Sequence, residues 1–132
     1  MPRLLDYVVI RRDPLDLDHT GQSELLGFHV RAGAVTSPDS LPALTFQARA
    51  PSSRVPGPSP DLGGRVDLEI LVNGLPTGVV RITLDSVRGV WRTFSEPRLN
   101  ADSSANFVQF RSEQGLARIS DVVLWYQRDV QL

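Results

Sequence analysis

The segment Arg65-Val66-Asp67-Leu68-Glu69-Ile70-Leu71-Val72-Asn73-Gly74 decides the fold class of this chain. Apolar residues occupy every second position from Val66 to Val72, and a charged residue precedes each of the first three. Successive side chains of a strand point to opposite faces of its sheet, so this pattern predicts a strand with one buried and one hydrated face. Asn73 and Gly74 tolerate positive φ, and together with residues 75–78 they predict a hairpin turn before a β-branched run at 79–84.

Six further segments have the alternation or the β-branched composition of short strands. They are residues 4–11, 25–31, 43–50, 90–94, 106–111 and 119–126. Turn residues separate these segments, and no helical stripe is evident. About eight short strands without helices predict an all-β protein, a two-sheet antiparallel β-sandwich of the jelly-roll type. A small closed barrel is the alternative architecture.

The length of 132 residues is typical of one domain, which we expect to span residues 1–132. Residues 50–64 are rich in Pro, Gly and Ser, a composition that disfavours both helix and sheet. We interpret this segment as a surface loop, because the parts on either side would be marginal as separate cores. Such a loop suits docking onto another subunit, so Arg54, Val55 and Leu62 are candidate interface residues.

Charge and composition exclude several classes of function. Every one of the 14 basic residues is Arg, the acids number 15, and the net charge is -1. Codon bias in a GC-rich genome accounts for the missing Lys, and selection for the planar guanidinium at an interface is the alternative. A slightly acidic domain lacks the net basic patch that nucleic-acid binding needs. The absence of Cys excludes disulfides, thiolate zinc sites and a Cys nucleophile.

No segment has the length and apolarity of a membrane span, and Asp6 interrupts the N-terminus before a signal-peptide apolar region develops. We therefore expect synthesis in the cytoplasm without a classical signal peptide or a membrane partner. Incorporation into a virion-like particle is compatible with that expectation.

Catalytic motifs are missing from the sequence. His19 and His29 are the two imidazoles, and neither stands in a recognisable nucleophile, zinc or nucleotide motif. The four Glu residues are Glu24, Glu69, Glu96 and Glu113, and Glu69 is on the hydrated face of its strand. We therefore predict that the protein is not an enzyme and needs no cofactor.

Calcium is the one metal for which the sequence contains candidate ligands. Asp16-Leu17-Asp18-His19-Thr20-Gly21 resembles the start of an EF-hand loop, but position twelve is Gly27 rather than the bidentate Glu. Asp13, Asp16 and Asp18 are the candidate calcium ligands. An acidic turn with local side-chain hydrogen bonds is the alternative interpretation, and it is favoured.

The segment 90–94 holds the main candidates for ligand binding. In a strand, Trp91 lies on the face opposite to Arg92 and Phe94, so one of the two aromatic side chains leaves the core. An exposed Trp beside Arg is suited to stacking on a sugar or anchoring an interface. The alternative, which is favoured, places Trp91 in the core. The same question arises for Trp125, where core membership is also favoured.

Residues 65–130 resemble the galactose-binding-type jelly roll of many non-catalytic carbohydrate-binding modules. The resemblance rests on the strand and turn at 66–74, the Asn-led strand Asn106-Phe107-Val108-Gln109-Phe110, Gly115, and the final strand Ile119-Ser120-Asp121-Val122-Val123-Leu124. In that family, glycans meet aromatic and polar groups on loops or on a concave sheet face. The resemblance implies Trp91, Arg92 and Asn106 as glycan contacts.

The same fold occurs in accessory proteins of phage-like particles, which need no signal peptide. We therefore expect a non-catalytic structural or binding protein, an oligomeric accessory or surface subunit such as a capsid-decoration or tail protein. Its partners would be other proteins, including copies of itself. The alternative is a carbohydrate-binding module that recognises a glycan through an exposed aromatic residue.

Overall fold

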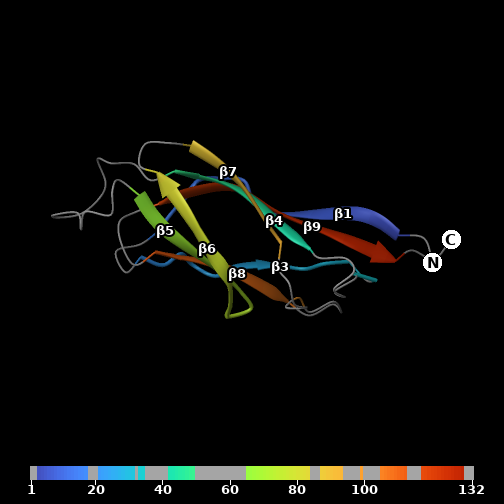
Figure 1. The fold of residues 1–132 in the computed structure, drawn as a ribbon. Helices are drawn as coiled ribbons and strands as arrows, with labels where there is room; N and C mark the ends of the chain where they lie inside the picture. Colours follow the sequence, from blue (N-terminus) through green and yellow to red (C-terminus); the bar gives the residue numbers. More distant parts are fainter. Residues whose placement is uncertain are drawn as a thin grey trace.

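The computed structural model is an all-β protein over the residues it describes, which are 3–17, 21–31, 33–34, 42–49, 65–83, 87–93, 99, 105–112 and 117–129. Nine strands form in this part of the chain (Figure 1). They are β1 (Arg3–Arg11), β2 (Leu15–Asp16), β3 (Leu26–Phe28), β4 (Ala43–Arg49), β5 (Arg65–Val72), β6 (Leu75–Thr83), β7 (Val87–Thr93), β8 (Asn106–Ser112) and β9 (Arg118–Asp129). In the same part of the chain, no helix has the length and apolar character needed to cross a membrane.

The strands form two antiparallel sheets packed face to face. One sheet has the order β1-β9-β4-β7, with β2 continuing the β1 edge along β9, and the other has the order β3-β8-β5-β6. If β1 and β2 are counted as two parts of one strand, this is the order of an eight-stranded jelly roll. The predicted two-sheet sandwich is confirmed.

Alternating apolar residues of both sheets meet in one core between the layers. Leu44, Phe110 and Leu124 are fully buried, and the rings of Phe46 and Phe110 pack edge to face across the sandwich at 5.0 Å between centroids. Burying a side chain of this size contributes roughly 1.5–3 kcal/mol. The period-two pattern of the sequence thus accounts for which residues are inside.

The β5–β6 hairpin turns over Asn73 and Gly74, whose φ values are 50° and 82°. Both residues therefore have the left-handed conformation of a type I′ turn, which the Asn-Gly dipeptide favours. The expectation that residues 75–78 belong to the turn is wrong, because β6 already begins at Leu75. Pro76 is accommodated there because β6 is an edge strand and the register with β5 shifts between Ile70 and Leu71.

Other strand limits differ from those expected. The two-residue strand β2 was not predicted, since two residues are too few to show alternation. β3 covers only Leu26–Phe28 of the segment 25–31, whereas β9 extends the segment 119–126 to Arg118–Asp129. The segment 50–64, with the interface candidates Arg54, Val55 and Leu62, lies outside the described residues.

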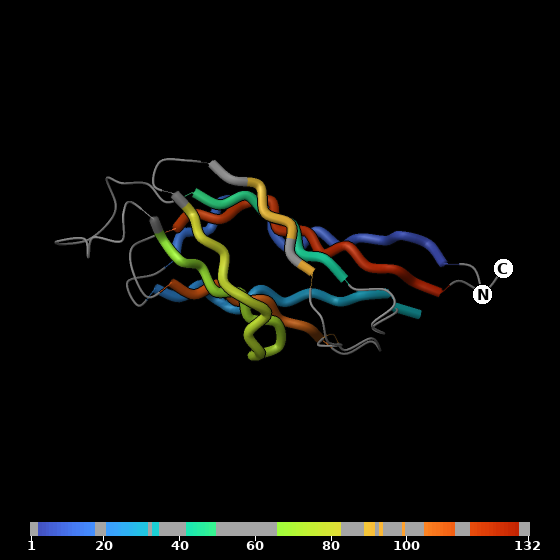
Figure 2. Tube along the Cα trace, viewed as in Figure 1, coloured from blue at the N-terminus to red at the C-terminus, as the bar shows by residue number. Residues whose placement is uncertain are grey.

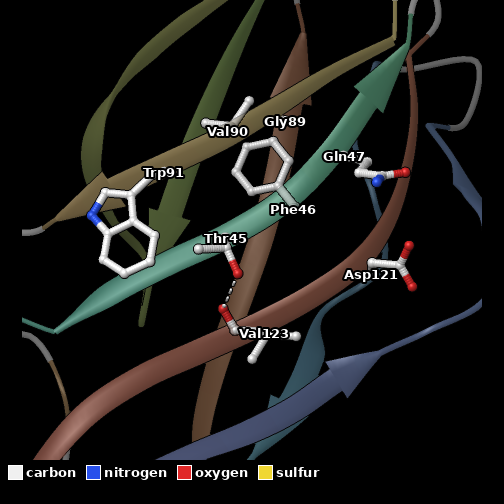
Figure 3. Close-up of a pocket in the computed structure, with 8 residues that line it drawn as sticks. All are labelled: Thr45, Phe46, Gln47, Gly89, Val90, Trp91, Asp121 and Val123. Atoms are coloured by element: carbon white, nitrogen blue, oxygen red, sulfur yellow. Dashed lines mark hydrogen bonds between the residues drawn. The ribbon is translucent and has the colours of Figure 1, made fainter. Parts of the chain in front are cut away.

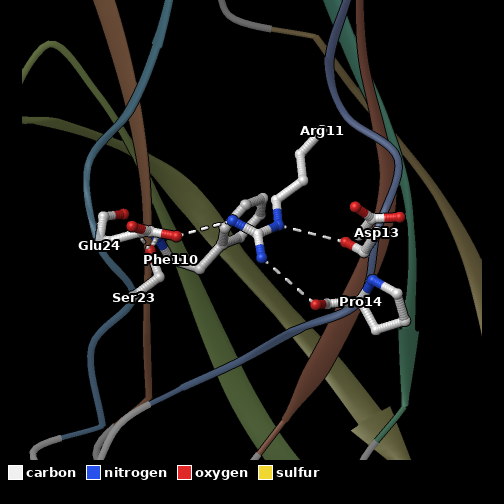
Figure 4. A network of polar contacts seen from close by, with 6 residues as sticks. All are labelled: Arg11, Asp13, Pro14, Ser23, Glu24 and Phe110. Atoms are coloured by element: carbon white, nitrogen blue, oxygen red, sulfur yellow. Dashed lines mark hydrogen bonds and ion pairs between the residues drawn. The ribbon is translucent and has the colours of Figure 1, made fainter.

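Two polar clusters fasten the N-terminal strand. Near the start of β1, the Asp6 carboxylate pairs with Arg128 at 3.1 Å and with Arg31 at 3.7 Å. At its end, the Arg11 guanidinium donates to the Glu24 carboxylate at 2.7 Å and to the backbone carbonyls of Asp13 and Pro14 (Figure 4). The backbone ladder itself joins β1 to β9, and the two strands run side by side along their paired length (Figure 2).

Candidate functional site

The five-stranded sheet turns one face away from the core, and we call this the outer face. Its residues include Leu5, Tyr7 and Val9 of β1, Val123 and Trp125 of β9, Thr45, Gln47 and Arg49 of β4, and Gly89 and Trp91 of β7. Leu5, Tyr7 and Trp91 are more than half exposed. Large exposed apolar patches are typical of interaction sites, so the outer face is the candidate surface.

Trp91 is the most prominent aromatic residue of the outer face, with an exposed fraction of 64%. Its neighbour Val90 is 8% exposed and packs in the core, so the alternation of β7 turns Trp91 outward. Trp91 pairs with Thr45 of β4 in the strand register. Of the two alternatives left open by the sequence, the exposed Trp91 is the one found.

A hollow of about 400 Å³ lies beside Trp91 on the outer face (Figure 3). Its lining residues are Thr45, Phe46, Gln47, Gly89, Val90, Trp91, Asp121 and Val123. Gly89 opposes Gln47 across the β4–β7 ladder, and no atom lies within 4 Å of where a Cβ of residue 89 would stand. The missing side chain of Gly89 therefore contributes directly to the open space beside the indole.

A β-bulge brings a carboxylate to this hollow. The register between β4 and β9 shifts between Thr45 and Gln47, and Asp121 in the bulged stretch has a φ of 53°. Ile119 and Val122 are buried, so the two residues between them, Ser120 and Asp121, both leave the core side. A bulge typically redirects a side chain in this way. Asp121 is exposed and lines the hollow.

Aromatic residues also cross the sheet from one edge to the other. The rings of Tyr7 and Trp125, which pair between β1 and β9, lie 5.4 Å apart at a tilt of 39°. Trp125 donates its indole N–H to the Thr45 hydroxyl at 2.9 Å, and Thr45 is the register partner of Trp91. The strands of Trp91 and Tyr7, β7 and β1, are three strand spacings apart, a distance of roughly 14 Å. Trp125, expected in the core, is instead half-buried on the outer face.

A second, smaller hollow of about 110 Å³ lies next to the first and shares Gln47 with it. Its other lining residues are Ala48, Arg49, Arg118 and Ser120. Arg118 holds the Asp16 carboxylate through Nε at 2.9 Å and Nη2 at 3.1 Å. Two effects raise the pKa of Arg118 above its ordinary value: mainly this hydrogen bonding and, second, the negative charge of Asp16. Arg118 therefore stays cationic.

Of the other predicted binding residues, Asn106 is the one whose side chain the structure describes. Asn106 is fully buried in the four-stranded sheet, where its side-chain oxygen accepts a hydrogen bond from the Asn73 amide at 3.0 Å. The backbone of Arg92 pairs with Leu44, but its side chain lies outside the described part, as does Phe94. Asn106 therefore has the position of a structural residue, with no path to the outer face.

Of the three calcium candidates, the structure describes Asp13 and Asp16. Asp16 is paired with Arg118, and the Asp13 carbonyl accepts a hydrogen bond from Arg11. Among the described residues, which exclude Asp18, no three metal-ligating side chains form a group. The Asp16 carboxylate is thus paired with a guanidinium, whereas Arg11 contacts the backbone of Asp13.

The candidate catalytic groups are scattered in the described part of the chain. His29 is exposed beyond the end of β3, and His19 lies outside the described residues. Glu24 pairs with Arg11, and Glu69 pairs with Arg111 on the other sheet. His29, Glu24 and Glu69 do not line the hollow beside Trp91.

Known proteins resemble this chain in structure but not in sequence. No protein-family model and no curated protein matches the sequence. Among solved structures, the chain is similar to the xylan-binding module CBM15, with 9% identity, a TM-score of 0.54, and coverage of 95% of this chain and 97% of that one. The fold-level resemblance to jelly-roll carbohydrate-binding modules, predicted from residues 65–130, is confirmed.

Larger proteins contain the same fold as one part. Dimeric latent PorU from Porphyromonas gingivalis matches with a TM-score of 0.64 and 13% identity over 100% of this chain. The insecticidal delta-endotoxin Cry8Ea1 from Bacillus thuringiensis matches with a TM-score of 0.52 and 10% identity over 89%. This chain spans only 13% of the PorU chain and 20% of the endotoxin. These likenesses describe the fold and not the activity.

Several residues of the outer face were missed by the sequence analysis. Thr45 and Gln47 lie in the predicted strand 43–50 and Asp121 in the motif of the last strand, but none of the three was a candidate for binding. The one available signal was Gly89, since a glycine inside a strand often marks a bulge or a place of close approach. The bulge that exposes Asp121 arises from pairing between strands far apart in sequence, and no local pattern predicts it.

Proposed function

We propose that this protein is a non-catalytic carbohydrate-binding domain that holds a glycan against the outer face. The observation that carries the proposal is Trp91, which stands 64% exposed beside an open hollow with polar groups at its rim. A rigid indole offers a large apolar area at a small cost in side-chain entropy. A sugar ring could lie on it with its apolar face down and its hydroxyl groups toward the rim.

The polar rim provides hydrogen-bonding groups of both kinds. Gln47 offers an amide donor and acceptor, and the Asp121 carboxylate offers acceptors only. Both side chains are exposed. The Thr45 hydroxyl already accepts from Trp125 and donates to the Val123 carbonyl at 3.5 Å, so we assign it to the support of the platform. Sugar hydroxyls would therefore be recognised by Gln47 and Asp121.

The fold-level likeness to a xylan-binding module supports this proposal, because that structure is nearly the same size and is named for its ligand. Identity of 9% transfers the fold alone. The choice of ligand face is therefore based on Trp91 and its surroundings.

The proposal is tested by affinity electrophoresis and titration calorimetry with soluble xylan, galactan, glucan and pectin. Trp91→Ala should abolish binding to any polysaccharide that the unaltered protein retains. Phe107→Ala is the matched control, since Phe107 is an exposed aromatic residue of the other sheet. Absence of binding to every polysaccharide, or equal binding by Trp91→Ala, would reject the proposal.

A second candidate function is an accessory subunit that docks onto a larger particle, or onto copies of itself. The observation in its favour is the edge strand β1, where Leu5 is 68% and Tyr7 57% exposed. Long exposed edges with apolar side chains are templates for association. Light scattering over a wide concentration range should then give a mass above the monomer that Leu5→Arg lowers. A constant monomeric mass would reject self-association.

A further inference from the structure

The small hollow at the end of the outer face has a lining that selects by charge. Arg49, Arg118, Gln47 and Ser120 all bring donors to it, and none of the described residues that line it is a carboxylate. Arg118 uses Nε and Nη2 on Asp16, which leaves Nη1 outside that pair. Arg49 is exposed, and among the described residues it has no ion-pair partner. Within the described part of the chain, the charge of the Arg49 guanidinium is thus not offset by a carboxylate.

Register places the two arginines together. Arg49 of β4 pairs directly with Arg118 of β9, and like charges opposite each other destabilise a sheet. Asp16 offsets one of the two charges. An anion between Arg49 and the free side of Arg118 would offset the other. Guanidinium groups bind carboxylate and sulfate oxygens in fixed, bidentate geometry.

We propose that this hollow, lined by Arg49 and Arg118, receives the acidic group of the bound glycan, a uronic acid carboxylate or a sulfate ester. The inference rests on the proposed function and adds the class of glycan. Arg49 is four residues along β4 from Thr45, the partner of Trp91, which is roughly 13 Å. The ligand that touches both is therefore an acidic oligosaccharide or polysaccharide.

The Asp121 carboxylate determines which of the two hollows can receive the acidic group of the ligand. Asp121 lines the hollow beside Trp91 and does not line the hollow at Arg49. A ligand carboxylate next to Asp121 would be repelled, whereas the same group at Arg49 is attracted. The sugar stacked on Trp91 is therefore the neutral part of the ligand, and the acidic sugar is farther along β4.

The experiment compares matched polysaccharides by titration calorimetry. Carboxylate is tested by pectate against fully methyl-esterified pectin and by glucuronoxylan against carboxyl-reduced glucuronoxylan. Sulfate is tested by a sulfated galactan against its desulfated form. We expect at least one acidic member to bind more tightly than its neutral partner, with added salt reducing the difference. Arg49→Gln should lower affinity for that member roughly three- to tenfold and leave the neutral partner unchanged.

Arg81→Gln is the matched control, because Arg81 is an exposed arginine of the other sheet and should not affect binding. Equal affinity for acidic and neutral partners, both lost in Trp91→Ala, would overturn the charge selection and retain the glycan platform. An acidic preference that survives in Arg49→Gln would place the acidic group elsewhere and overturn the assignment. Binding of no member would overturn this inference and the proposed function together.

Discussion

The indole N–H of Trp125 donates a 2.9 Å hydrogen bond to the hydroxyl of Thr45, which joins β9 to β4 through side chains at the centre of the outer face. The Thr45 hydroxyl donates in turn to the Val123 carbonyl at 3.5 Å. Thr45 therefore fixes the half-buried Trp125 to β4, the strand that pairs with the strand of Trp91. This support holds the platform without contributing a free group to it.

Thr45→Val should test that support, because it removes the hydroxyl and keeps the shape. The half-buried indole N–H of Trp125 would lose its acceptor, and we expect a loss of about 1 kcal/mol in the free energy of unfolding. Urea denaturation measures it. Thr93→Val is the control, since Thr93 is exposed on the same face. An equal loss in both variants would contradict the supporting role of Thr45.

Trp91→Ala should separate binding from stability. With 64% of the side chain exposed, its removal should change the free energy of unfolding by less than about 1 kcal/mol. Phe110→Ala, in the core, should instead cost roughly 3–5 kcal/mol. Thermal and urea unfolding of the two variants give the comparison. A cost for Trp91→Ala near that for Phe110→Ala would place the indole in the core.

Gly89→Val should block the hollow by filling it. A Cβ at this position meets no atom within 4 Å, and a β-branched residue suits a strand. The variant should fold with at least the stability of the unaltered protein, since glycine weakens strands by roughly 0.5–1 kcal/mol relative to alanine. Its affinity for glycan should fall strongly. Unchanged affinity in a folded Gly89→Val would show that ligands do not use the hollow.

Asp121 combines a conformational and a chemical requirement that substitutions can separate. Its φ of 53° is left-handed, which costs most residues roughly 1–2 kcal/mol but is tolerated by Asn and Gly. Asp121→Ala should therefore lose stability, whereas Asp121→Asn should keep it and lose only the charge. Asp121→Gly should keep the bulge and remove the ligand contact. Weaker glycan binding by a stable Asp121→Gly is the expected result, and unchanged binding would remove Asp121 from the site.

The fold was predictable because its signals are local. Alternation over 65–72 and the Asn73-Gly74 turn specify a hairpin, and the same period recurs in the strands around it. The outer face was less predictable, since it depends on which strands become neighbours. Trp91 could be recognised as a candidate, but its exposure follows from the pairing of Val90 with Phe46 toward the core. Asp121 depends on a bulge formed with β4, and that is a property of the sheet.

Asn106 shows how a family pattern can identify a residue and mislead about its role. The Asn-led strand is present, yet Asn106 is fully buried and holds Asn73 at 3.0 Å. Asn73 uses its own side-chain oxygen to accept the backbone N–H of Phe107 at 2.8 Å. The pair therefore ties the β5–β6 turn to the first residues of β8.

Asn106→Ala should consequently act on stability. The partly buried amide of Asn73 would lose an acceptor, and we expect a cost of roughly 1–3 kcal/mol in the free energy of unfolding, measured with urea. Glycan affinity should be unchanged at temperatures where the variant remains folded, because the outer face belongs to the opposite sheet. The reverse pattern, with lost affinity and intact stability, would make Asn106 a ligand contact and move the binding surface to the other side of the sandwich.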